Sequence, residues 1–306
     1  MSNFPKKLKL KIEQRAANYM LRSLKEQSSL IDFSSNDYLG FAKSPSIFTK
    51  THQYLIAENC IQNGATGSRL LSGNHSLYAR VETELSVFHQ AEAAIIFNAG
   101  YAANIGFFAA VPQRGDVIFY DEYIHASIRD GISMSASKSY KFKHNNVAGL
   151  EEKITRYKKN NKEIAEIYVV TEAVFSMDGD TPDLETMAFI CNKMNAHFIV
   201  DEAHSVGVFG EKGAGKIVAL GLEKAVFARI ITFGKALGCH GAAILGSEDL
   251  KKYILNFSRS LIYTTALSPH AIASIKIAYE TLQSESLSDF SQRKLQENIE
   301  FFTAEI

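Results

Sequence analysis

The alternation of short apolar runs with helical segments between residues 94 and 232 is the strongest constraint on the fold of this chain. Strands buried on both faces read as continuous apolar runs, and strands that alternate with helices are typical of a parallel sheet. The sequence therefore predicts an α/β fold, with a mostly parallel central sheet and helices on both faces. Strands are expected at Ala94–Asn98, Val117–Asp121, Tyr140–Lys143 and Ala242–Leu245, and within 166–176, 197–205 and 228–234.

The first part of the chain predicts less regular structure. Residues 5–27 have the four-residue apolar spacing of an amphipathic helix, and Leu30–Ser34 is an apolar run that predicts a short strand. Ser44 followed by Pro45 predicts the start of a helix. After a glycine- and serine-rich loop, Asn74 is expected to cap the next helix.

Composition excludes several classes of function. The 306 residues carry no formal net charge, so they offer no basic surface for nucleic acid. The lysine-rich N-terminus lacks the apolar core of a signal peptide, and no run approaches the ~18 apolar residues of a membrane span. Cys60, Cys191 and Cys239 are too few and too far apart for a disulfide framework or a zinc site. We therefore expect a cytoplasmic protein without a metal, membrane or nucleic-acid partner.

A single lysine lies on a glycine-rich turn between two apolar strands, in the run TFGKALGCHGAA (232–243). The glycines around Lys235 remove side chains that would otherwise block access to its amine. Burial between strands lowers the pKa of a lysine, and a neutral amine can form a Schiff base with a carbonyl. The alternative is a solvated lysine on an ordinary turn, and this stretch alone does not decide between the two.

Polar residues follow several of the predicted strands. Because the carboxyl ends of parallel strands meet at one edge of a sheet, these residues are expected to converge there. Gly100 would open a helix at the same edge, and free N–H groups at a helix start bind phosphate. The converging residues are His125, Glu172, Ser176, Asp201, His204 and Lys235.

Two motifs resemble parts of a nucleic-acid helicase. Residues 201–204 read Asp-Glu-Ala-His, and residues 210–217 nearly match a phosphate-binding loop. In that loop, however, Ile217 stands where a hydroxyl should hold magnesium. The two motifs are also nearly adjacent and in the wrong order, so they cannot face one nucleotide from neighbouring strands. The zero net charge further disfavours a helicase.

The segments SSNDYLGF (34–41), TGSRLLSGN (66–74), NAGYAAN (98–104), DEYIHAS (121–127), VVTEAVFSMDGD (169–180), VDEAHSVGVFG (200–210), TFGKALGCHGAA (232–243) and SLIYTTALSPH (260–270) keep a fixed order and spacing. Together they resemble the α-oxoamine synthases, which are pyridoxal 5'-phosphate (PLP) enzymes of fold type I, the aspartate-aminotransferase fold type. Within that family the chain is most similar to the 8-amino-7-oxononanoate synthases. The resemblance runs from about residue 34 to residue 270.

The resemblance assigns a role to each converging residue. Lys235 would hold the cofactor as a Schiff base, and Asp201 would keep the pyridinium nitrogen protonated. His125 would stack on the pyridine ring, although a histidine like this, taken alone, is more often just a packed residue. His204 and Ser176 would reach the phenolic oxygen of the ring.

Further residues take roles only through the resemblance. They would contact the phosphate (Gly100, Tyr101 and Thr232), the phosphate of the neighbouring subunit in a homodimer with shared active sites (Thr264 and Thr265), the substrate amino acid (Asn36), the reacting groups (Glu172) and the distal carboxylate of the acyl chain (Arg22).

The implied reaction condenses an amino acid, L-alanine, with pimeloyl-CoA or a pimeloyl acyl carrier protein (ACP) and releases CO2. Glycine C-acetyltransferase activity and an inactive PLP-binding remnant are the alternatives. The implied parts are an N-terminal segment (1–45), a large PLP-binding domain (46–275) and a truncated C-terminal domain (276–306). Because the family's carboxylate-binding arginine lies in the C-terminal domain, we expect PLP binding but poor turnover.

Overall fold

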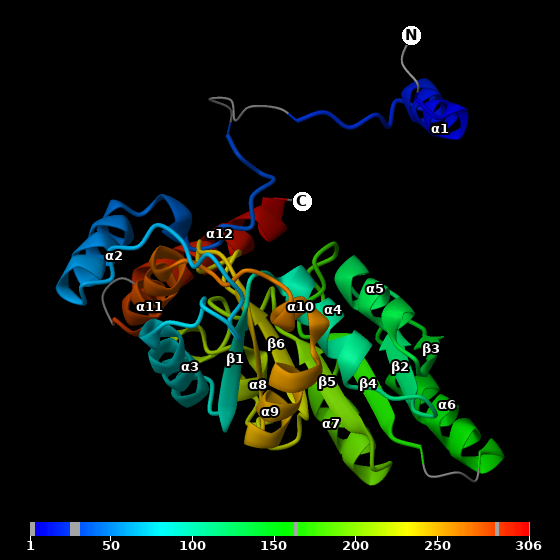
Figure 1. Ribbon diagram of the computed structural model, residues 1–306. Coiled ribbons are helices and arrows are strands. Elements are labelled where there is room, and N and C mark those ends of the chain that lie inside the picture. Colours follow the sequence, from blue (N-terminus) through cyan, green and yellow to red (C-terminus); the bar gives the residue numbers. More distant parts are fainter. Residues whose placement is uncertain (1–3, 25–30, 162–164, 285–287, 306) are drawn as a thin grey trace. The chain divides into compact units, whose positions relative to one another are not determined.

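A seven-stranded sheet forms the centre of the protein, in the order β1-β7-β6-β5-β4-β2-β3. The structure, a computed structural model, describes residues 4–24, 31–161, 165–284 and 288–305 (Figure 1). Strands β3, β2, β4, β5 and β6 pair in parallel, and only β7 runs against its neighbours β6 and β1. The predicted α/β fold with a mostly parallel sheet is confirmed. The strands are β1 (Ala93–Phe97), β2 (Val117–Asp121), β3 (Lys138–Phe142), β4 (Ile167–Glu172), β5 (His197–Asp201), β6 (Ala228–Thr232) and β7 (Ala242–Gly246).

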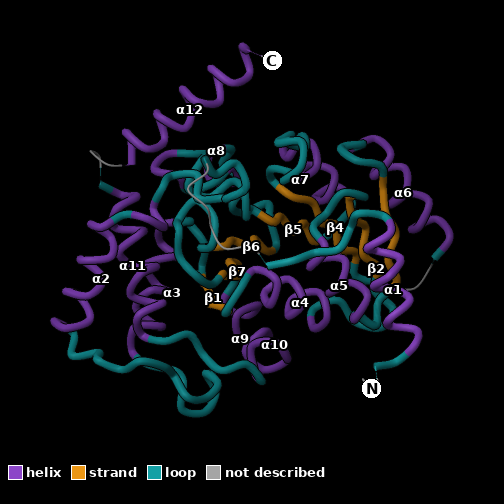
Figure 2. The backbone as a smooth tube through the Cα atoms, turned by 90° about the horizontal axis from the view of Figure 1, so that it is seen from above, coloured by secondary structure: helices purple, strands orange, loops and turns teal. Residues whose placement is uncertain are grey.

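Helices cover both faces of this sheet, as Figure 2 shows from above. The helices are α2 (Pro45–Ala57), α3 (Ser76–Phe88), α4 (Gly100–Ala110), α5 (Ala126–Met134), α6 (Val147–Asn160), α7 (Leu184–Lys193), α8 (Lys216–Ala219), α9 (Glu248–Phe257), α10 (Arg259–Ile262), α11 (Pro269–Gln283) and α12 (Ser288–Glu305). A separate helix, α1 (Lys6–Ala17), precedes them.

Alternation along the strands divides the core between the two faces. Ile95 and Phe97 of β1 pack with α4, α5, α9 and α10, whereas Ala94 and Ile96 pack with α2, α3 and α11 on the other face. Helices α6 and α7 continue that second face over β2, β4 and β5. Only the edge strand β3 is largely exposed. This two-sided burial explains why the strands read as continuous apolar runs.

The contacts divide the chain into two units, Met1–Ser35 and Asn36–Ile306. In the first unit, α1 ends at Ala17, and Tyr19, two residues later, adopts a left-handed conformation. The helix predicted for residues 5–27 was therefore too long. Residues 25–27 lie outside the described residues. Helix α1 buries no side chain, so no packing extends it.

Two further predictions from the first part of the chain were wrong. Residues 31–34 form no strand, because the Asp32 carboxylate accepts hydrogen bonds from the amides of Ser34 (2.8 Å) and Ser35 (3.1 Å) and bends the chain. Leu30 lies outside the described residues. Asn74 does not cap α3, since its Oδ1 accepts from Nε of Arg69 (3.1 Å) and His75 takes the cap position.

The second unit agrees with the cap predicted for α2, although it departs from the cap predicted at Asn74. Ser44 caps α2 with Pro45 at its first turn, as predicted. The boundary expected at residues 275–276 falls inside α11. Helix α12 belongs to the same unit, and the side chain of Gln292 on this helix donates to the carbonyl of Gly207 (2.9 Å).

Candidate functional site

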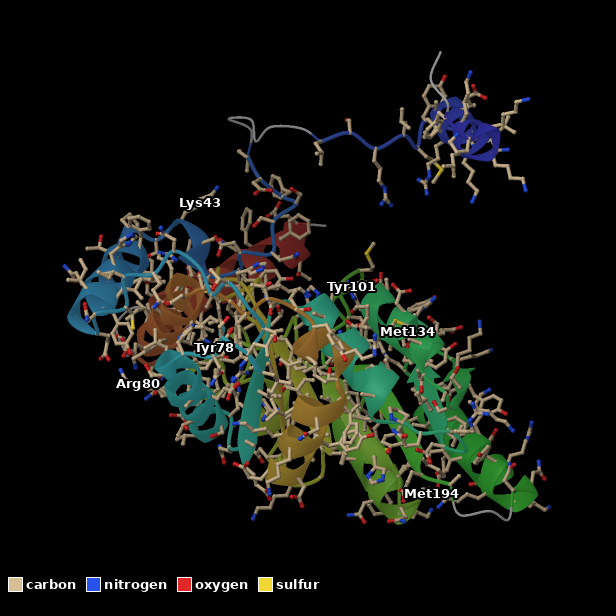
Figure 3. All side chains as sticks on the ribbon, in the orientation of Figure 1. Lys43, Tyr78, Arg80, Tyr101, Met134 and Met194 are labelled. Carbon is tan, nitrogen blue, oxygen red and sulfur yellow. The ribbon has the colours of Figure 1, made fainter. Side chains whose placement is uncertain are left out.

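A cavity of about 170 Å³ lies at the carboxyl ends of the central strands. Figure 3 places Tyr101, at the start of α4, at this end of the sheet, and Met194, which precedes β5, at the opposite end. The sheet thus brings residues from five separate segments to one edge, as the sequence predicts. The lining residues are Gly100, Tyr101, Asn104, His125, Ser127, Glu172, Asp201, Ala203, Ile230, Ile231, Thr232 and Lys235.

Lys235 lies on the turn that joins β6 to the antiparallel β7. The turn is fixed by hydrogen bonds from the amide of Gly238 to the carbonyl of Lys235 (2.8 Å) and from the amide of Phe233 to the carbonyl of Gly241 (2.9 Å). Gly238 has φ +59°, and a Cβ there would lie 2.1 Å from the backbone nitrogen of Ala42. Only glycine fits this position, which explains part of the glycine pattern around the lysine.

The amine of Lys235 is desolvated and hydrogen-bonded to Nε2 of His204. Burial lowers the pKa of Lys235, and the carboxylates of Asp201 and Glu172 oppose that shift without cancelling it. Burial and the nearby positive charge of Lys235 lower the pKa of His204 to about 4. The site therefore holds a neutral imidazole beside a lysine that loses its proton more readily than usual.

Asp201 ends β5 and lies at the floor of the cavity, almost fully buried. Its Oδ2 accepts a hydrogen bond from Nδ2 of Asn104 (3.0 Å), and its Oδ1 accepts from the amide of Ala203 (2.9 Å). The same Asn104 nitrogen donates to the hydroxyl of Ser127 (3.0 Å). A carboxylate supported in this way stays in one orientation while it faces the cavity.

His125 and Glu172 form the adjoining wall. The amide of His125 donates to Oε1 of Glu172 (2.6 Å), and Nδ1 of His125 lies 2.7 Å from the hydroxyl of Ser127. Burial, with the nearby negative charge of Asp201, raises the pKa of Glu172 to about 8. Glu172 thus retains a proton at neutral pH and can donate as well as accept a hydrogen bond.

The start of α4 supplies the remaining polar groups. Its cap residue is Ala99, which offers no side-chain oxygen to the first-turn N–H groups. Gly100 and Tyr101 of this turn line the cavity, and Thr232 faces them from the end of β6. The hydroxyl of Tyr101 is turned to Asp130 on α5 (2.5 Å). Free N–H groups at a helix start, together with a hydroxyl, suit an anionic oxygen.

A buried ion pair holds the loop after β5 in place. Nε of Arg229 donates to Oε2 of Glu202 (2.7 Å), whose Oε1 accepts from Ser205 (3.0 Å) and from the amide of Ile217 (3.1 Å). Both charged residues are almost fully buried. Glu202 in the Asp-Glu-Ala-His run is thus a structural residue, which agrees with the rejection of a helicase. The short loop at 210–217 packs against this pair.

Some predicted residues do not line the cavity in this chain. Ser176 is exposed in the loop after β4, and Thr264 and Thr265 lie after α10, where Thr265 bridges to Ser68. Asn36 is exposed and accepts a hydrogen bond from the hydroxyl of Tyr38 (3.2 Å). Arg22 lies in the first unit and is exposed.

Sequence reasoning missed three polar residues near the lysine. Asn104 lies one helical turn after Gly100, so helical spacing from that glycine would have placed it on the same face. Ser127 lies two residues after His125, within a segment that was already singled out. Tyr38 is distant in sequence, and no local signal links it to His204, whose Nδ1 lies 2.7 Å from its hydroxyl.

The raised pKa of Glu172 predicts a pH-dependent stability. The folded chain holds the Glu172 proton up to about pH 8, whereas the unfolded chain releases it near the ordinary value of 4.5. Stability therefore falls as pH rises between these values, by up to about 1.4 kcal/mol per unit.

Glu172→Gln keeps an acceptor for the His125 amide but carries no titrating proton. Urea unfolding across this pH range should show the variant gaining stability relative to the parent chain as pH rises. Parallel curves for the two proteins would contradict the assignment.

Two absences concern only the described parts of the chain. No group of three or more His, Cys, Asp or Glu side chains is arranged to hold a metal ion among those residues. None of the helices described is both long and apolar enough to cross a membrane.

Comparison with known sequences identifies the family. Residues 28–306 match the family model described as aminotransferase class I and II. The 8-amino-7-oxononanoate synthase of Emericella nidulans is 41% identical over 90% of this chain and 69% of its own length. Across curated relatives of this name, the chain spans about two thirds of their length.

Solved structures agree with this assignment. The 8-amino-7-oxononanoate synthase of Francisella tularensis is 30% identical, with a TM-score of 0.73 over 90% of this chain and 75% of its own. A serine palmitoyltransferase from S. paucimobilis with a bound PLP–myriocin aldimine is 26% identical, with a TM-score of 0.80 over 91% of this chain and 72% of its own. The chain therefore belongs to the class I and II aminotransferase family, within its α-oxoamine synthases of fold type I.

Proposed function

We propose that this chain binds PLP at the cavity and joins an amino acid to an acyl thioester. The observation that carries the proposal is the placement of a lysine with a lowered pKa in one cavity with a buried aspartate and an uncapped helix start. Each of these groups is chemically suited to bind a different part of the cofactor. The relatives named above support the same assignment.

The donor set fits PLP. The amine of Lys235 suits the aldehyde carbon, and the buried carboxylate of Asp201 suits a protonated ring nitrogen. The free N–H groups of Gly100 and Tyr101, with the hydroxyl of Thr232, suit the phosphate. The imidazole of His125, which lines the same cavity, would offer a flat face to the ring.

When bound, PLP supplies an electron sink for cleavage of a bond at the α-carbon of an amino acid. The chain's own residues bind, orient and move protons around that centre. Lys235 would act as the base at that centre, because burial lowers the pKa of its amine and lets it release a proton more readily than an exposed lysine. Glu172, with its raised pKa of about 8, can donate a hydrogen bond to an oxygen that gains charge.

The proposed substrates are L-alanine and pimeloyl-CoA or pimeloyl-ACP, which would give 8-amino-7-oxononanoate, CO2 and the free thiol. This is the function in the names of the relatives from Emericella nidulans and Francisella tularensis. Asn36 is proposed to contact the amino acid, and Arg22 the far carboxylate of the acyl group. Ser176 is proposed to reach the phenolic oxygen of the cofactor after its loop moves inward.

A homodimer with shared sites is also proposed. Thr264 and Thr265 lie outside the cavity of their own chain, on a segment held by hydrogen bonds from Nδ2 of Asn98 to the carbonyl of Thr265 (2.7 Å) and from the amide of Ala266 to the carbonyl of Gly67 (2.9 Å). A fixed segment whose hydroxyls lie outside the cavity of their own chain is suited to serve the site of a second copy.

The test is to load the purified chain with PLP and add single amino acids while recording the visible absorption spectrum. L-Alanine should change the spectrum, and addition of pimeloyl-CoA should then release CO2. A response to glycine and acetyl-CoA instead would assign the acetyltransferase reaction. PLP binding without a response to any amino acid would contradict the proposed synthase activity.

A further inference from the structure

A continuous hydrogen-bonded chain links the surface to the cavity lysine. The hydroxyl of Tyr38 lies 3.2 Å from Oδ1 of Asn36 and 2.7 Å from Nδ1 of His204. Nε2 of the same imidazole is hydrogen-bonded to the amine of Lys235. Tyr38 therefore holds the imidazole of His204 at Nδ1, while the amine of Lys235 contacts Nε2.

Counting protons along this chain gives each bond a direction. The Oδ1 atom of Asn36 can only accept, so the single hydroxyl proton of Tyr38 points to it. The Tyr38 oxygen must then accept the second bond, which places a proton on Nδ1 of His204. A neutral imidazole carries only one proton, so Nε2 is left with a lone pair that faces Lys235.

The surroundings keep both groups in the required protonation state. Burial raises the pKa of Tyr38, so its hydroxyl keeps its proton. The pKa of His204 of about 4, caused first by burial, leaves the ring neutral at pH 7. The backbone around Tyr38 is also fixed, because the amide of Gly40 donates to the carbonyl of Asp37 (3.1 Å) and Leu39 is buried.

We propose that Tyr38 is a positioning residue that sets the tautomer of His204, keeping the proton on Nδ1 while the amine of Lys235 faces Nε2. A tyrosine hydroxyl both donates and accepts, so it can turn when the group beside Nε2 changes. When an acceptor oxygen faces Nε2, Tyr38 donates to Nδ1. The ring then gives its Nδ1 proton to water and takes a proton from water at Nε2, so it stays neutral. This second half rests on the proposed function, in which the phenolic oxygen of PLP is that acceptor.

The reversal has a consequence for Asn36. When Tyr38 turns its proton to Nδ1, Oδ1 of Asn36 loses its donor and becomes free to accept from another group. Asn36 is exposed, and the amino acid is its proposed ligand. Tyr38 therefore couples the state of the lysine to a proposed substrate contact. Phenylalanine at this position would keep the ring and lose both hydrogen bonds.

The first measurement is the tautomer itself, by nitrogen NMR of histidine-labelled protein before PLP is added. The chain has nine histidines, so a His204→Gln variant assigns the signal. The parent chain should show a protonated Nδ1 and an unprotonated Nε2. Tyr38→Phe should shift both signals toward the opposite tautomer, whereas Tyr54→Phe should not. Tyr54 is a matched control because it is partly buried and hydrogen-bonded to Arg80 (2.6 Å), outside the cavity.

The second measurement adds PLP to the same samples. The His204 signals should reverse in the parent chain. Covalent capture, followed by absorbance, should slow by about twofold to tenfold in Tyr38→Phe, as for loss of the hydrogen bond to His204. A proton on Nε2 in the parent chain before PLP, or identical spectra for the parent and Tyr38→Phe, would overturn the proposal.

The two hypotheses fail in different ways. Capture of PLP without reversal of the His204 signals would overturn the second half of the tautomer proposal while the proposed function stands. Failure of the parent chain to capture PLP would overturn the proposed function and the reversal together. The spectra recorded before PLP would still decide whether Tyr38 sets the tautomer.

Discussion

Replacing Lys235 with alanine is expected to abolish covalent capture of PLP. The parent chain mixed with PLP and reduced with borohydride should gain the mass of one cofactor on the peptide that contains Lys235. The variant should gain none, because the cavity lining includes no other amine within the described residues. Mass spectrometry of the intact protein measures this directly.

Lys216→Ala is the matched control for this experiment. Lys216 is also partly buried, lies 4.7 Å from the ring of Phe209, and has a pKa lowered by burial, but it lies outside the cavity. A low pKa alone would make both lysines reactive, whereas cavity placement makes only Lys235 reactive. Capture that survives in Lys235→Ala and is lost in Lys216→Ala would refute the assignment.

Lys235→Ala has a second expected effect that does not depend on the cofactor. The positive charge of Lys235 is the second cause of the low pKa of His204, after burial. Its removal should raise that pKa toward the ordinary value without reaching it, because burial remains. Histidine titration by NMR would show this shift. An unchanged pKa would mean that the amine and the imidazole are not neighbours in solution.

Much of the fold was predictable because buried strands leave a strong local pattern. The apolar runs of β1, β2, β4, β5, β6 and β7 all appear within a few residues of the predicted positions. The convergence of Glu172, Asp201 and Lys235 followed from parallel direction alone. The antiparallel direction of β7 could not be predicted in this way, because the glycine-rich turn that reverses the chain also reads as an ordinary loop.

The errors occur where local hydrogen bonds compete with an apolar pattern. Leu30–Ser34 reads as a strand, but the side chain of Asp32 binds its own backbone. The long N-terminal helix ends early because it buries nothing. Such outcomes depend on side-chain partners and packing that apolar spacing alone does not reveal.

Long-range contacts explain what was missed in the site. Tyr38 reaches His204 across 166 positions in sequence, and Asn104 reaches Asp201 across 97. Neither spacing follows from helical or strand periodicity. Conversely, Ser176, Thr264 and Thr265 take their roles from resemblance. Ser176 is proposed to reach the cofactor only after its own loop moves, and the two threonines are proposed to serve a second chain. Geometry within one chain therefore leaves those roles as proposals.

Removal of the Asp201 charge is the second change with a large expected effect. Breaking a buried ion pair by removing one partner costs about 3–5 kcal/mol, so Asp201→Asn should weaken PLP binding by roughly a hundredfold to a few thousandfold. Asparagine keeps the volume and an acceptor for the amide of Ala203, so the fold should persist. Equilibrium titration of PLP with the variant measures the loss.

Asp121→Asn is the control for this experiment. It distinguishes the loss of a charge that would face the ring nitrogen from the loss of any buried carboxylate. Asp121 is fully buried at the end of β2, but it binds His144 (2.9 Å) and does not line the cavity. Its replacement should lower the free energy of unfolding and leave PLP affinity close to that of the parent chain. If both variants lost affinity equally, Asp201 would be a structural residue only.

Asp201→Asn should also change the pKa values of two neighbouring residues, Glu172 and Lys235. The negative charge of Asp201 raises the pKa of Glu172, after burial, and raises that of Lys235 against a larger effect of burial. Without that charge both pKa values should fall, so Glu172 would release its proton at lower pH and the amine would become neutral more readily. Covalent capture of PLP could then begin at lower pH even as its equilibrium affinity drops. A pH profile that did not move would mean that the charge of Asp201 does not act on the amine of Lys235, so the direction of the shift tests this electrostatic interaction separately from the cofactor affinity.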